Sequence, residues 1–371
     1  MPARVLEAIG RATTDHRGPD HPALTRTVLE GLRDVFRTTG DVLVFPASGT
    51  GGWEAALVNT LSPGDRVLFV ETGQFAASWI GVARRFGLEV EVIPTDWRRG
   101  AEPERIEERL TADRDRAIAA VAVVHCETST GAVSRIAEVR RAMDRAGHAA
   151  LLLVDAVSSV GSIDYRHDEW RVDVSVGASQ KGLMLPPGLA FLAVSERALE
   201  ASRTARLPRS YWDWHAMLAQ NAKGYFPYTP ATNLLFGLRE ALAILHEEGL
   251  DAVIRRHARH GRAARAAVHA WGLDVQCIVA EEMSDVLTAV VMPDGHDADR
   301  FRGLVLERFN MALGTGLGRL AGRVFRIGHV GDMNDLMLLG ALAGVESGLV
   351  LAGVPIRRGG VDAAMRSLEQ D

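Results

Sequence analysis

Lysine is the residue that this sequence lacks most. Of its 42 Lys and Arg residues only Lys181 and Lys223 are lysines, so 40 are arginines. A guanidinium stays protonated in proteins, whereas a partly desolvated lysine amine can lose its proton and attack a carbonyl carbon. Lys181 nevertheless remains where an apolar run, Val172 to Val176, gives way to small residues. It is therefore a candidate for a reactive amine, and the alternative is an ordinary surface lysine.

Disulfides, long apolar runs and an excess of positive charge are also missing. The two cysteines, Cys126 and Cys277, are too few for a disulfide framework and lack the spacing of a zinc site, so we expect a reducing compartment and no metal. No apolar run reaches the roughly 18 residues of a membrane span, and no secretory leader opens the chain. The net charge of −5, without a basic stripe, argues against nucleic acid as a partner. We expect a cytoplasmic protein that binds small molecules and neither membranes nor nucleic acids.

Apolar runs alternate with helical patterns along most of the chain, which is typical of a doubly wound α/β fold. With 371 residues, the chain exceeds what one hydrophobic core usually serves. We therefore expect a large domain with a mostly parallel sheet over residues 1–248 and a smaller α+β domain over 249–371. The predicted strands are 41–46, 67–70, 90–93, 119–124, 151–154, 172–176, 190–194, 275–279, 287–291 and one around Arg326. The predicted helices are 4–11, 22–37, 53–61, 75–86, 103–110, 136–145, 232–248, 251–271, 298–308 and a final one at 335–351.

An aspartate at the end of a buried strand is the second sign of a reactive site. The apolar run 151–154 predicts a strand buried on both faces, and Asp155 follows it directly. In open α/β sheets, ligands bind beyond the carboxyl ends of the strands, where Lys181 is also expected. A carboxylate there can keep a pyridinium nitrogen protonated, so Lys181 and Asp155 together suggest pyridoxal phosphate. A helix cap or a metal ligand is the alternative role for Asp155.

A glycine-rich turn between a strand and a helix is a candidate phosphate site. The segment 47–52 has the sequence Ala-Ser-Gly-Thr-Gly-Gly and precedes the helix predicted at 53–61. Backbone N–H groups of Gly51 and Gly52, the positive end of the helix and the Thr50 hydroxyl together suit an anion. The turn lacks the Walker ending and the full dinucleotide spacing, which argues against ATP and NAD. A turn that binds no ligand is the alternative.

Three further side chains lie where they could reach a ligand. Phe75 opens a helix directly after a strand, and its ring could face a planar cofactor or only pack in the core. Thr128 lies in a segment rich in hydroxyl groups and could donate to a cofactor oxygen or only stabilise its own turn. Arg326 is flanked by apolar residues on an alternating strand, which suits a bound carboxylate or an internal salt bridge.

Two irregular segments, 208–215 and 223–230, hold three of the four tyrosines. Aromatic residues with polar tips concentrate in interfaces and ligand pockets. We therefore expect a subunit contact near the site.

Taken together, these segments resemble the alanine/serine–glyoxylate aminotransferases, which are pyridoxal phosphate enzymes of fold type I, class V. The resemblance runs essentially end to end and is strongest to the bacterial serine–glyoxylate enzymes. Six segments in the same order carry it: Ser48–Trp53, His125–Gly131, Val154–Ser159, Ser179–Gly182, Tyr225–Pro230 and Phe325–Gly328.

The resemblance implies a role for each candidate residue. It implies that Lys181 forms a Schiff base with the cofactor, that Asp155 pairs with the pyridinium nitrogen and that Phe75 stacks on the ring. It further implies that Thr128 contacts the ring oxygen and that Arg326 binds the substrate carboxylate. The residues implied for the phosphate are Thr50, Gly51 and Gln180, with Tyr228 and Thr229 from the other subunit of a homodimer.

The function that follows is transfer of an amino group from serine, or a related small amino acid, to glyoxylate, giving hydroxypyruvate and glycine. Alanine or aspartate as donor, a pyridoxal phosphate lyase on the same fold, and a cofactor-binding module without catalysis are the alternatives. Aspartate carries a second carboxylate and would need a further cation, for which His16, Arg17 and Arg209 are candidates.

One difference from the family concerns the amino terminus. Relatives carry a Gly-Pro-Thr-Asn-like segment ahead of the position of Met1, and this segment reaches the active-site entrance. Its absence predicts either a start placed too late or a site that closes differently.

Overall fold

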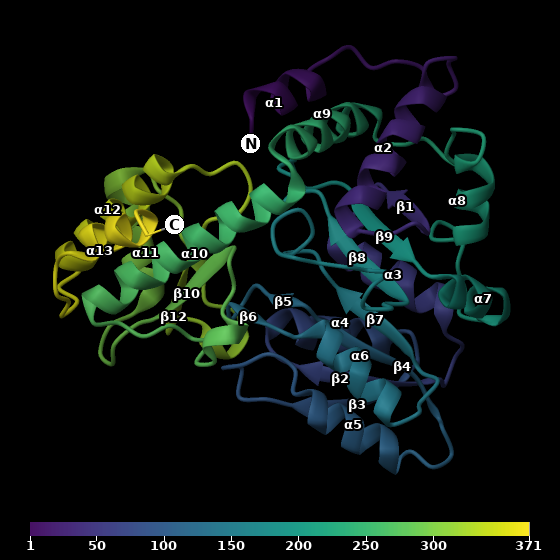
Figure 1. Ribbon diagram of the computed structural model, residues 1–371, viewed down its shortest axis with the longest axis horizontal. Helices are drawn as coiled ribbons and strands as arrows, with labels where there is room; N and C mark the ends of the chain where they lie inside the picture. Colours follow the sequence, from purple (N-terminus) through teal and green to yellow (C-terminus); the bar gives the residue numbers. More distant parts are fainter. Residues whose placement is uncertain (371) are drawn as a thin grey trace.

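A computed structural model describes residues 1–370 and contains a large β-sheet, a small β-sheet and a two-stranded hairpin. The large sheet forms the core of the larger lobe, and the small sheet lies in the lobe at the left of Figure 1. The large sheet has the strand order β1-β9-β8-β7-β4-β2-β3. Its strands are β1 (Asp41–Phe45), β2 (Arg66–Glu71), β3 (Glu89–Pro94), β4 (Ile118–Val124), β7 (Leu151–Asp155), β8 (Val174–Ala178) and β9 (Ala190–Val194).

The large sheet is mostly parallel, as the sequence predicts. β3, β2, β4, β7 and β8 run parallel to one another, and β9 is antiparallel to both of its neighbours, β8 and β1. Strands β7, β8 and β9 are buried along their whole length. This explains their nearly uninterrupted apolar sequences, because parallel strands in the middle of such a sheet are covered on both faces.

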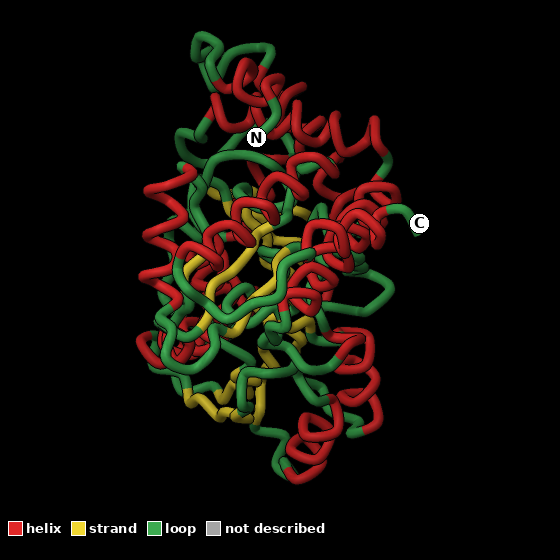
Figure 2. Tube along the Cα trace, turned by 90° about the vertical axis from the view of Figure 1, so that its left-hand side faces the viewer, coloured by secondary structure: helices red, strands yellow, loops and turns green. Residues whose placement is uncertain are grey.

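Helices cover both faces of the large sheet, which Figure 2 shows as yellow strands between red helices. Alternate residues of each strand point to opposite faces: Val42 and Val44 of β1 belong to one apolar core, and Leu43 and Phe45 to the other. The helices on the first face are α2 (His21–Phe36), α5 (Pro103–Ala112), α6 (Ile136–Arg145) and α9 (Thr232–Glu248), with α1 (Ala3–Ile9) packed on α9. The helices on the second face are α3 (Gly49–Thr60), α4 (Gln74–Arg85), α7 (Glu196–Thr204) and α8 (Trp214–Asn221).

The small sheet is antiparallel and has its own core. Its order is β10 (Leu287–Val291), β12 (Val324–Gly328) and β11 (Gly314–Thr315). The helices packed around it are α10 (Leu250–Trp271), α11 (Ala298–Phe309), α12 (Asp335–Leu351) and α13 (Gly360–Leu368). Helices α9 and α10 meet at Gly249, which has a φ of 83°. The division into domains 1–248 and 249–371 stays a prediction.

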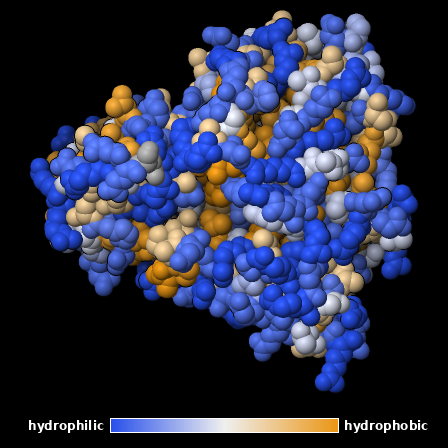
Figure 3. All heavy atoms as spheres, viewed as in Figure 1, coloured by the Kyte–Doolittle hydropathy of each residue, from blue (hydrophilic) through white to orange (hydrophobic). Residues whose placement is uncertain are grey.

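A fourth apolar cluster lies between the two lobes. It includes Trp97 of the large lobe and Val286, Leu287 and Leu320 of the small one, all of them buried. On the face drawn in Figure 3, apolar side chains gather in the hollow between the two lobes. The lobes are therefore in apolar contact as well as joined by the chain.

The predicted strand 275–279 is wrong. Val275 makes an isolated bridge to Val290, but Ile278 N then donates to Arg98 O of the large lobe at 2.9 Å, and a 3₁₀ helix (Ala280–Glu282) follows. The segment leaves the small sheet because its backbone groups pair with the other lobe. The apolar pattern of 275–279 reflects the burial of Val275 in the small-lobe core and of Cys277, and not a strand.

Three boundaries near the strand ends also differ from the prediction. The strand expected at 172–176 is β8 (Val174–Ala178), so Lys181 follows its end more closely. The helix expected to begin at Trp53 begins at Gly49, so the glycines form its first turn. The segment around Thr128 contains a small hairpin, β5 (Cys126–Glu127) with β6 (Ala132–Val133).

The chain does not end with the helix predicted at 335–351, because α13 follows it. Gly359 precedes α13 with a φ of 110°, and Ala364 of α13 is buried in the small-lobe core. The two glycines at 359 and 360 mark the turn at which α13 begins. Within residues 1–370, no helix is long and apolar enough to cross a membrane.

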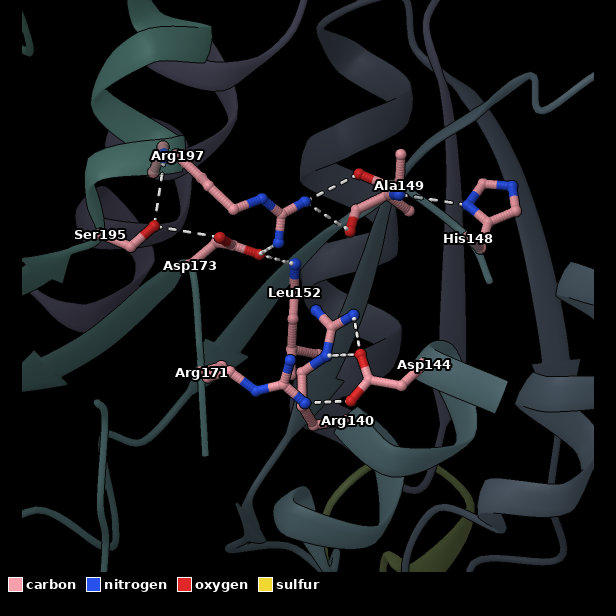
Figure 4. A network of polar contacts seen from close by, with 11 residues as sticks. Arg140, Asp144, His148, Ala149, Leu152, Arg171, Asp173, Ser195 and Arg197 are labelled. Atoms are coloured by element: carbon pink, nitrogen blue, oxygen red, sulfur yellow. Dashed lines mark hydrogen bonds and ion pairs between the residues drawn. The ribbon is translucent and has the colours of Figure 1, made fainter. Parts of the chain in front are cut away.

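The amino ends of β7 and β8 are joined by a buried carboxylate, Asp173, drawn in Figure 4. Asp173 is 1% exposed, and its side chain accepts hydrogen bonds from Leu152 N (2.8 Å), Ser195 Oγ (3.0 Å) and Arg197 Nη1 (3.1 Å). Ser195 is the residue that caps α7. Asp173 therefore links β7, β8 and the start of α7 at the end of the sheet opposite to Lys181.

We predict that Asp173→Ala lowers the free energy of unfolding by about 3 kcal/mol, because it leaves buried donors without an acceptor. The matched control is Arg171→Ala, which removes only the exposed ion pair with Asp144 in the same view. It should cost less than about 1 kcal/mol. Urea denaturation followed by circular dichroism measures both, and equal losses would contradict the prediction.

Candidate active site

Lys181 lies on a rigid turn directly after β8. Lys181 O accepts from Met184 N at 2.9 Å, and Ser179 Oγ donates to Pro186 O at 2.7 Å. The following Gly182 has no room for a side chain, since a Cβ there would lie 2.3 Å from Val160 O. Backbone packing therefore fixes where the Lys181 side chain begins.

The environment of Lys181 favours its neutral amine. Burial lowers the pKa of Lys181, and the positive charge of Arg326 lowers it further, whereas Asp155 opposes this shift. A lysine that loses its proton more readily is a better nucleophile and proton carrier. This environment matches the reactive amine predicted from the sequence.

Asp155 ends β7 and is 4% exposed. Trp53 Nε1 donates to Asp155 Oδ2 at 3.0 Å, and Val157 N donates to Oδ1 at 2.8 Å. Burial raises the pKa of Asp155 to about 7, while these two hydrogen bonds and Lys181 act in the opposite direction. Asp155 is therefore a buried carboxylate whose ionised form would be stabilised by a nearby positive charge.

Lys181 and Arg326 line the same pocket, which has a volume of about 250 Å³. Thr128 and Ser158 line it from the large lobe, and their hydroxyl groups are hydrogen-bonded to each other. The remaining lining residues are small or apolar: Val286, Leu287, Ala312, Gly314, Gly328 and Val330. Both lobes thus contribute to one small pocket with two basic side chains and two hydroxyl groups.

The guanidinium of Arg326 is held by backbone carbonyls of both lobes. Its Nε donates to Thr315 O at 2.9 Å, and its Nη1 donates to Thr128 O at 2.7 Å. No Asp or Glu among residues 1–370 forms an ion pair with Arg326, so the alternative of an internal salt bridge is wrong. Burial lowers the pKa of Arg326, and the nearby Glu127 opposes this. Its charge is available to a ligand in the pocket.

The first turn of α3 contains Thr50, Gly51 and Gly52. The N-cap residue Ser48 makes no side-chain capping hydrogen bond, so it leaves the helix start to other acceptors. A Cβ on Gly51 would lie 2.8 Å from the Trp212 ring and one on Gly52 2.5 Å from Val176 Cγ1. The glycines therefore allow this turn to pack closely against the sheet and the 208–215 segment.

Gln180 adds an unsatisfied acceptor next to Lys181. Its Oε1 atom is buried and has no hydrogen-bond partner among the described residues. A buried polar atom without a partner is unusual in a folded protein. Gln180 is therefore a position at which a ligand donor or a water molecule would be favourable.

The first turn of α4, unlike that of α3, is capped by a buried glutamate. Glu127 Oε2 accepts from Phe75 N (3.1 Å) and Ala76 N (3.0 Å), and its Oε1 accepts from Ser129 Oγ (2.6 Å). Burial raises the pKa of Glu127. Because the Phe75 backbone N–H bonds to Glu127, the partly exposed ring of Phe75 is held next to the segment that contains Thr128.

Tyr228 and Thr229 do not line the pocket around Lys181 in their own chain. The Tyr228 ring stacks on Tyr211 with a centroid distance of 4.2 Å, and Thr229 is exposed. The proposed second-carboxylate cations also lie elsewhere. Arg209 donates to Val58 O, Ala205 O and Ser202 O, and neither His16 nor Arg17 is among the lining residues.

Three residues of the site were not identified from the sequence. Trp53 donates to Asp155, Ser158 bonds to Thr128 in the pocket, and Glu127 caps α4. Trp53 follows the glycine turn by only a few residues, and Ser158 follows Asp155 equally closely. This proximity in the sequence was the available signal. Nothing local to Glu127 indicated that it would cap a helix about fifty residues earlier.

Comparison with known proteins places these features in a family. The model of the family described as "Aminotransferase class-V" matches residues 8–318. The chain is 51% identical to a serine–glyoxylate aminotransferase of Methylorubrum extorquens, with 100% of this chain and 94% of the relative covered. It is 46% identical to an L-aspartate–glyoxylate aminotransferase of Paracoccus denitrificans, again with 100% and 94% covered.

A solved structure agrees with this assignment. The crystal structure of a ureidoglycine–glyoxylate aminotransferase from Bacillus subtilis matches with a TM-score of 0.92 at 29% identity, covering 99% of this chain and 95% of that one. The predicted fold, type I of the pyridoxal phosphate enzymes, is confirmed. The chain belongs to the class-V aminotransferase family.

Proposed function

We propose that this protein transfers an amino group from serine to glyoxylate with pyridoxal phosphate as cofactor. The observation that carries the proposal is the shared pocket of Lys181 and Arg326 beside the buried Asp155. An amine that loses its proton readily and a guanidinium without a carboxylate partner are the two groups that an amino acid substrate requires. Relatives named for serine, with glyoxylate as acceptor, agree with this choice.

The residues present fit pyridoxal phosphate. Membership of the class-V aminotransferases implies this cofactor. The buried Asp155 carboxylate suits a protonated ring nitrogen, which would supply the positive charge that lowers its pKa. The α3 start, with Thr50, Gly51 and Gly52, and the unpartnered Gln180 suit its phosphate.

The cofactor would be held by residues from several elements. Lys181 would bind it covalently, Phe75 would cover one face of its ring, and Thr128 would donate to its ring oxygen. When bound, the cofactor supplies an electron-withdrawing ring that stabilises negative charge at the substrate carbon. The protein contributes the orientation of the ring and the charge at its nitrogen.

Lys181 would also move the substrate proton. Its lowered pKa makes the neutral amine easier to form, so Nζ can accept a proton from the α-carbon and return it. Thr128 and Ser158 lie in the same pocket and could hold polar substrate atoms. Closure of the pocket by apolar residues such as Val286 and Leu287 limits the access of water.

The size and charge of the pocket favour substrates with one carboxylate. Arg326 can bind a carboxylate with its remaining N–H groups while two carbonyls fix its orientation. A cavity of about 250 Å³ suits small acids such as serine and glyoxylate. Besides Lys181 and Arg326, no Lys, Arg or His of residues 1–370 is among the lining residues.

Aspartate is the second candidate donor, because a relative at 46% identity carries that name. Aspartate would need another cation for its side-chain carboxylate, and the three candidates from the sequence do not line the pocket of their own chain. A residue supplied by a partner subunit would be required. This makes serine the better-supported donor.

We further propose a homodimer in which Tyr228 and Thr229 reach the phosphate of the partner subunit. The exposed Thr229 and the stacked pair of Tyr211 and Tyr228 form a surface that lies apart from the pocket of their own chain. A cytoplasmic location stays a prediction.

Borohydride reduction followed by peptide mapping should find the pyridoxyl group on Lys181 and not on Lys223. We expect this result because Lys181 is held beside Asp155 and Arg326, whereas Lys223 is exposed. Lys181→Ala should lose turnover by at least about 10³-fold, since it removes both the covalent link and the proton carrier. Label on Lys223, or turnover of Lys181→Ala at the wild-type rate, would disprove the assignment.

Hybrid dimers test the shared phosphate site. Lys181→Ala and Thr229→Arg should each be inactive alone. Mixing them in equal amounts should restore about a quarter of the sites, because about half of the dimers are hybrids and one site per hybrid keeps both Lys181 and the partner's Thr229. Activity is measured after joint denaturation and refolding, with each variant refolded alone as control. A fully active protein that sediments as a monomer would refute the proposal.

The donor is tested with a panel of amino acids and glyoxylate. We expect the highest kcat/KM for serine, with one glycine formed for each glyoxylate consumed, which a lyase would not produce. Arg326→Gln should lower kcat/KM for every carboxylate donor. If kcat/KM for aspartate exceeds that for serine by more than about tenfold, or ~1.4 kcal/mol, a second cation must bind the aspartate side chain and the assignment is wrong.

A further inference from the structure

Three buried histidines of the smaller lobe take no part in the proposed function. His257 and His260 belong to α10, His329 follows β12, and all three are 0% exposed. Burial lowers the pKa of each histidine, to about 4 for His257 and about 3 for His329. The neutral ring is therefore the favoured form at pH 7, and a neutral imidazole can donate one hydrogen bond and accept another.

His257 accepts a hydrogen bond from the backbone of Gly331. Its Nδ1 atom lies 2.8 Å from Val253 O, and because a carbonyl oxygen only accepts, Nδ1 carries the hydrogen. The Nε2 atom is then free to accept, and Gly331 N donates to it at 3.0 Å. A protonated ring would leave Gly331 N without this acceptor. The neutral side chain of His257 thus holds one particular backbone group.

Arg256, the residue before His257, holds the other polar backbone group of Gly331. Its Nη1 atom donates to Gly331 O at 2.9 Å and to Met333 O at 3.1 Å. Its Nε and Nη2 atoms bond to the carboxylate of Glu248, the last residue of α9, at 2.7 and 2.9 Å. Helix α10 runs from the end of α9 into the smaller lobe (Figure 1). Gly331 is therefore tied to both helices.

Gly331 packs against the turn that carries Lys181. It has a φ of 88°, and a Cβ there would lie 3.3 Å from Met184 Cγ and 3.6 Å from Lys181 O. A side chain at this position would be strained by the backbone conformation and would press on the turn. The absence of a side chain lets the two segments lie in direct contact.

The residues before Gly331 form one side of the substrate pocket. Gly328 and Val330 line the pocket around Arg326, and we call residues 328–331 the pocket wall. Strand β12 ends at Gly328, so the wall leaves the small sheet there. Its far end, Gly331, is held by α10 through the hydrogen bonds described above. The position of the wall therefore depends on two α10 side chains.

We propose that His257 and Arg256 are positioning residues for substrate binding, which they support by holding the pocket wall in place. Neither residue lines the pocket, so each acts through Gly331. The inference rests on the proposed function in one respect, namely that the pocket around Arg326 binds a small carboxylate. A displaced wall would weaken the ground state and the transition state alike, so KM should rise more than kcat falls.

Two substitutions of His257 separate its hydrogen bond from its bulk. The amide of Gln can place an acceptor near the position of Nε2, whereas the shorter Asn reaches only that of Nδ1. His257→Gln should therefore keep the bond to Gly331 N, and His257→Asn should lose it. The matched control is His260→Asn, because His260 is equally buried on α10 but its Nε2 bonds to Asp335 at 2.9 Å.

Binding of glycolate, an unreactive analogue of glyoxylate, to the holoenzyme measures the effect by isothermal titration calorimetry. We expect His257→Asn to raise the Kd for glycolate at least about tenfold, because small displacements at a binding site have large effects. His257→Gln and His260→Asn should stay within about threefold of wild type. In turnover, His257→Asn should raise KM for glyoxylate about tenfold and change kcat by less than about threefold.

A second pair of variants tests the same wall if His257→Asn does not fold, which circular dichroism would reveal. Arg256→Met removes the bonds to Gly331 O and Met333 O and should raise the Kd for glycolate in the same way. Its control is Glu248→Gln, which removes only the charge that pairs with Arg256 and should bind glycolate as wild type does. Both side chains are partly exposed, so these variants are expected to fold.

The outcomes separate this inference from the proposed function. If wild type binds glycolate but transfers no amino group, the proposed function fails and the binding comparison still decides the inference. The inference is overturned if folded His257→Asn binds glycolate as tightly as wild type, or if His257→Gln or His260→Asn binds it as weakly as His257→Asn. Where His257→Asn does not fold, wild-type affinity in Arg256→Met overturns it. A wild-type holoenzyme that does not bind glycolate overturns it as well.

Discussion

The withdrawal of Asp155 and Lys181 from water is the constraint on which the site depends. Asp155 ends one buried strand and Lys181 follows another. Burial favours the neutral form of each group: it raises the pKa of the carboxyl and lowers that of the amine. Burial also lowers the pKa of Arg326 and raises that of Glu127, so it favours the neutral form of both groups. Ligands with a positively charged ring and a carboxylate would suit this set of groups.

The arrangement of the two lobes determines how the substrate is bound. Arg326 belongs to the small sheet, yet its guanidinium donates to a carbonyl of each lobe, at Thr315 and Thr128. Thr128 follows the buried Glu127 that caps α4 and so fixes Phe75. Residues proposed for the substrate and for the cofactor ring are therefore connected by a short series of hydrogen bonds. A shift of one lobe would affect both.

The sequence predicted most of the large sheet, because strands buried on both faces have unmistakable apolar runs. It also singled out Lys181, Asp155 and Arg326, since a scarce lysine and charged residues at strand ends are visible without a structure; their catalytic and binding roles stay predictions. It did not predict the partner of a buried group when that partner is distant in the chain, as with Glu127 and the start of α4. It also misplaced a strand at 275–279, where Val275 and Cys277 are buried but Ile278 N bonds to the backbone of the other lobe. The local sequence pattern indicates which residues are buried, and only the tertiary structure shows which elements cover them.

The scarcity of lysine has a practical consequence. Reagents that acylate amines have few targets in this chain: the α-amino group, the partly buried Lys181 and the exposed Lys223 at the end of α8. A cofactor bound at Lys181 would protect that amine, so Lys223 becomes almost a unique handle for a dye, a crosslinker or a solid support. The same composition means that a trypsin digest cuts almost entirely at arginine, and a peptide ending in lysine reports directly on one of two known positions.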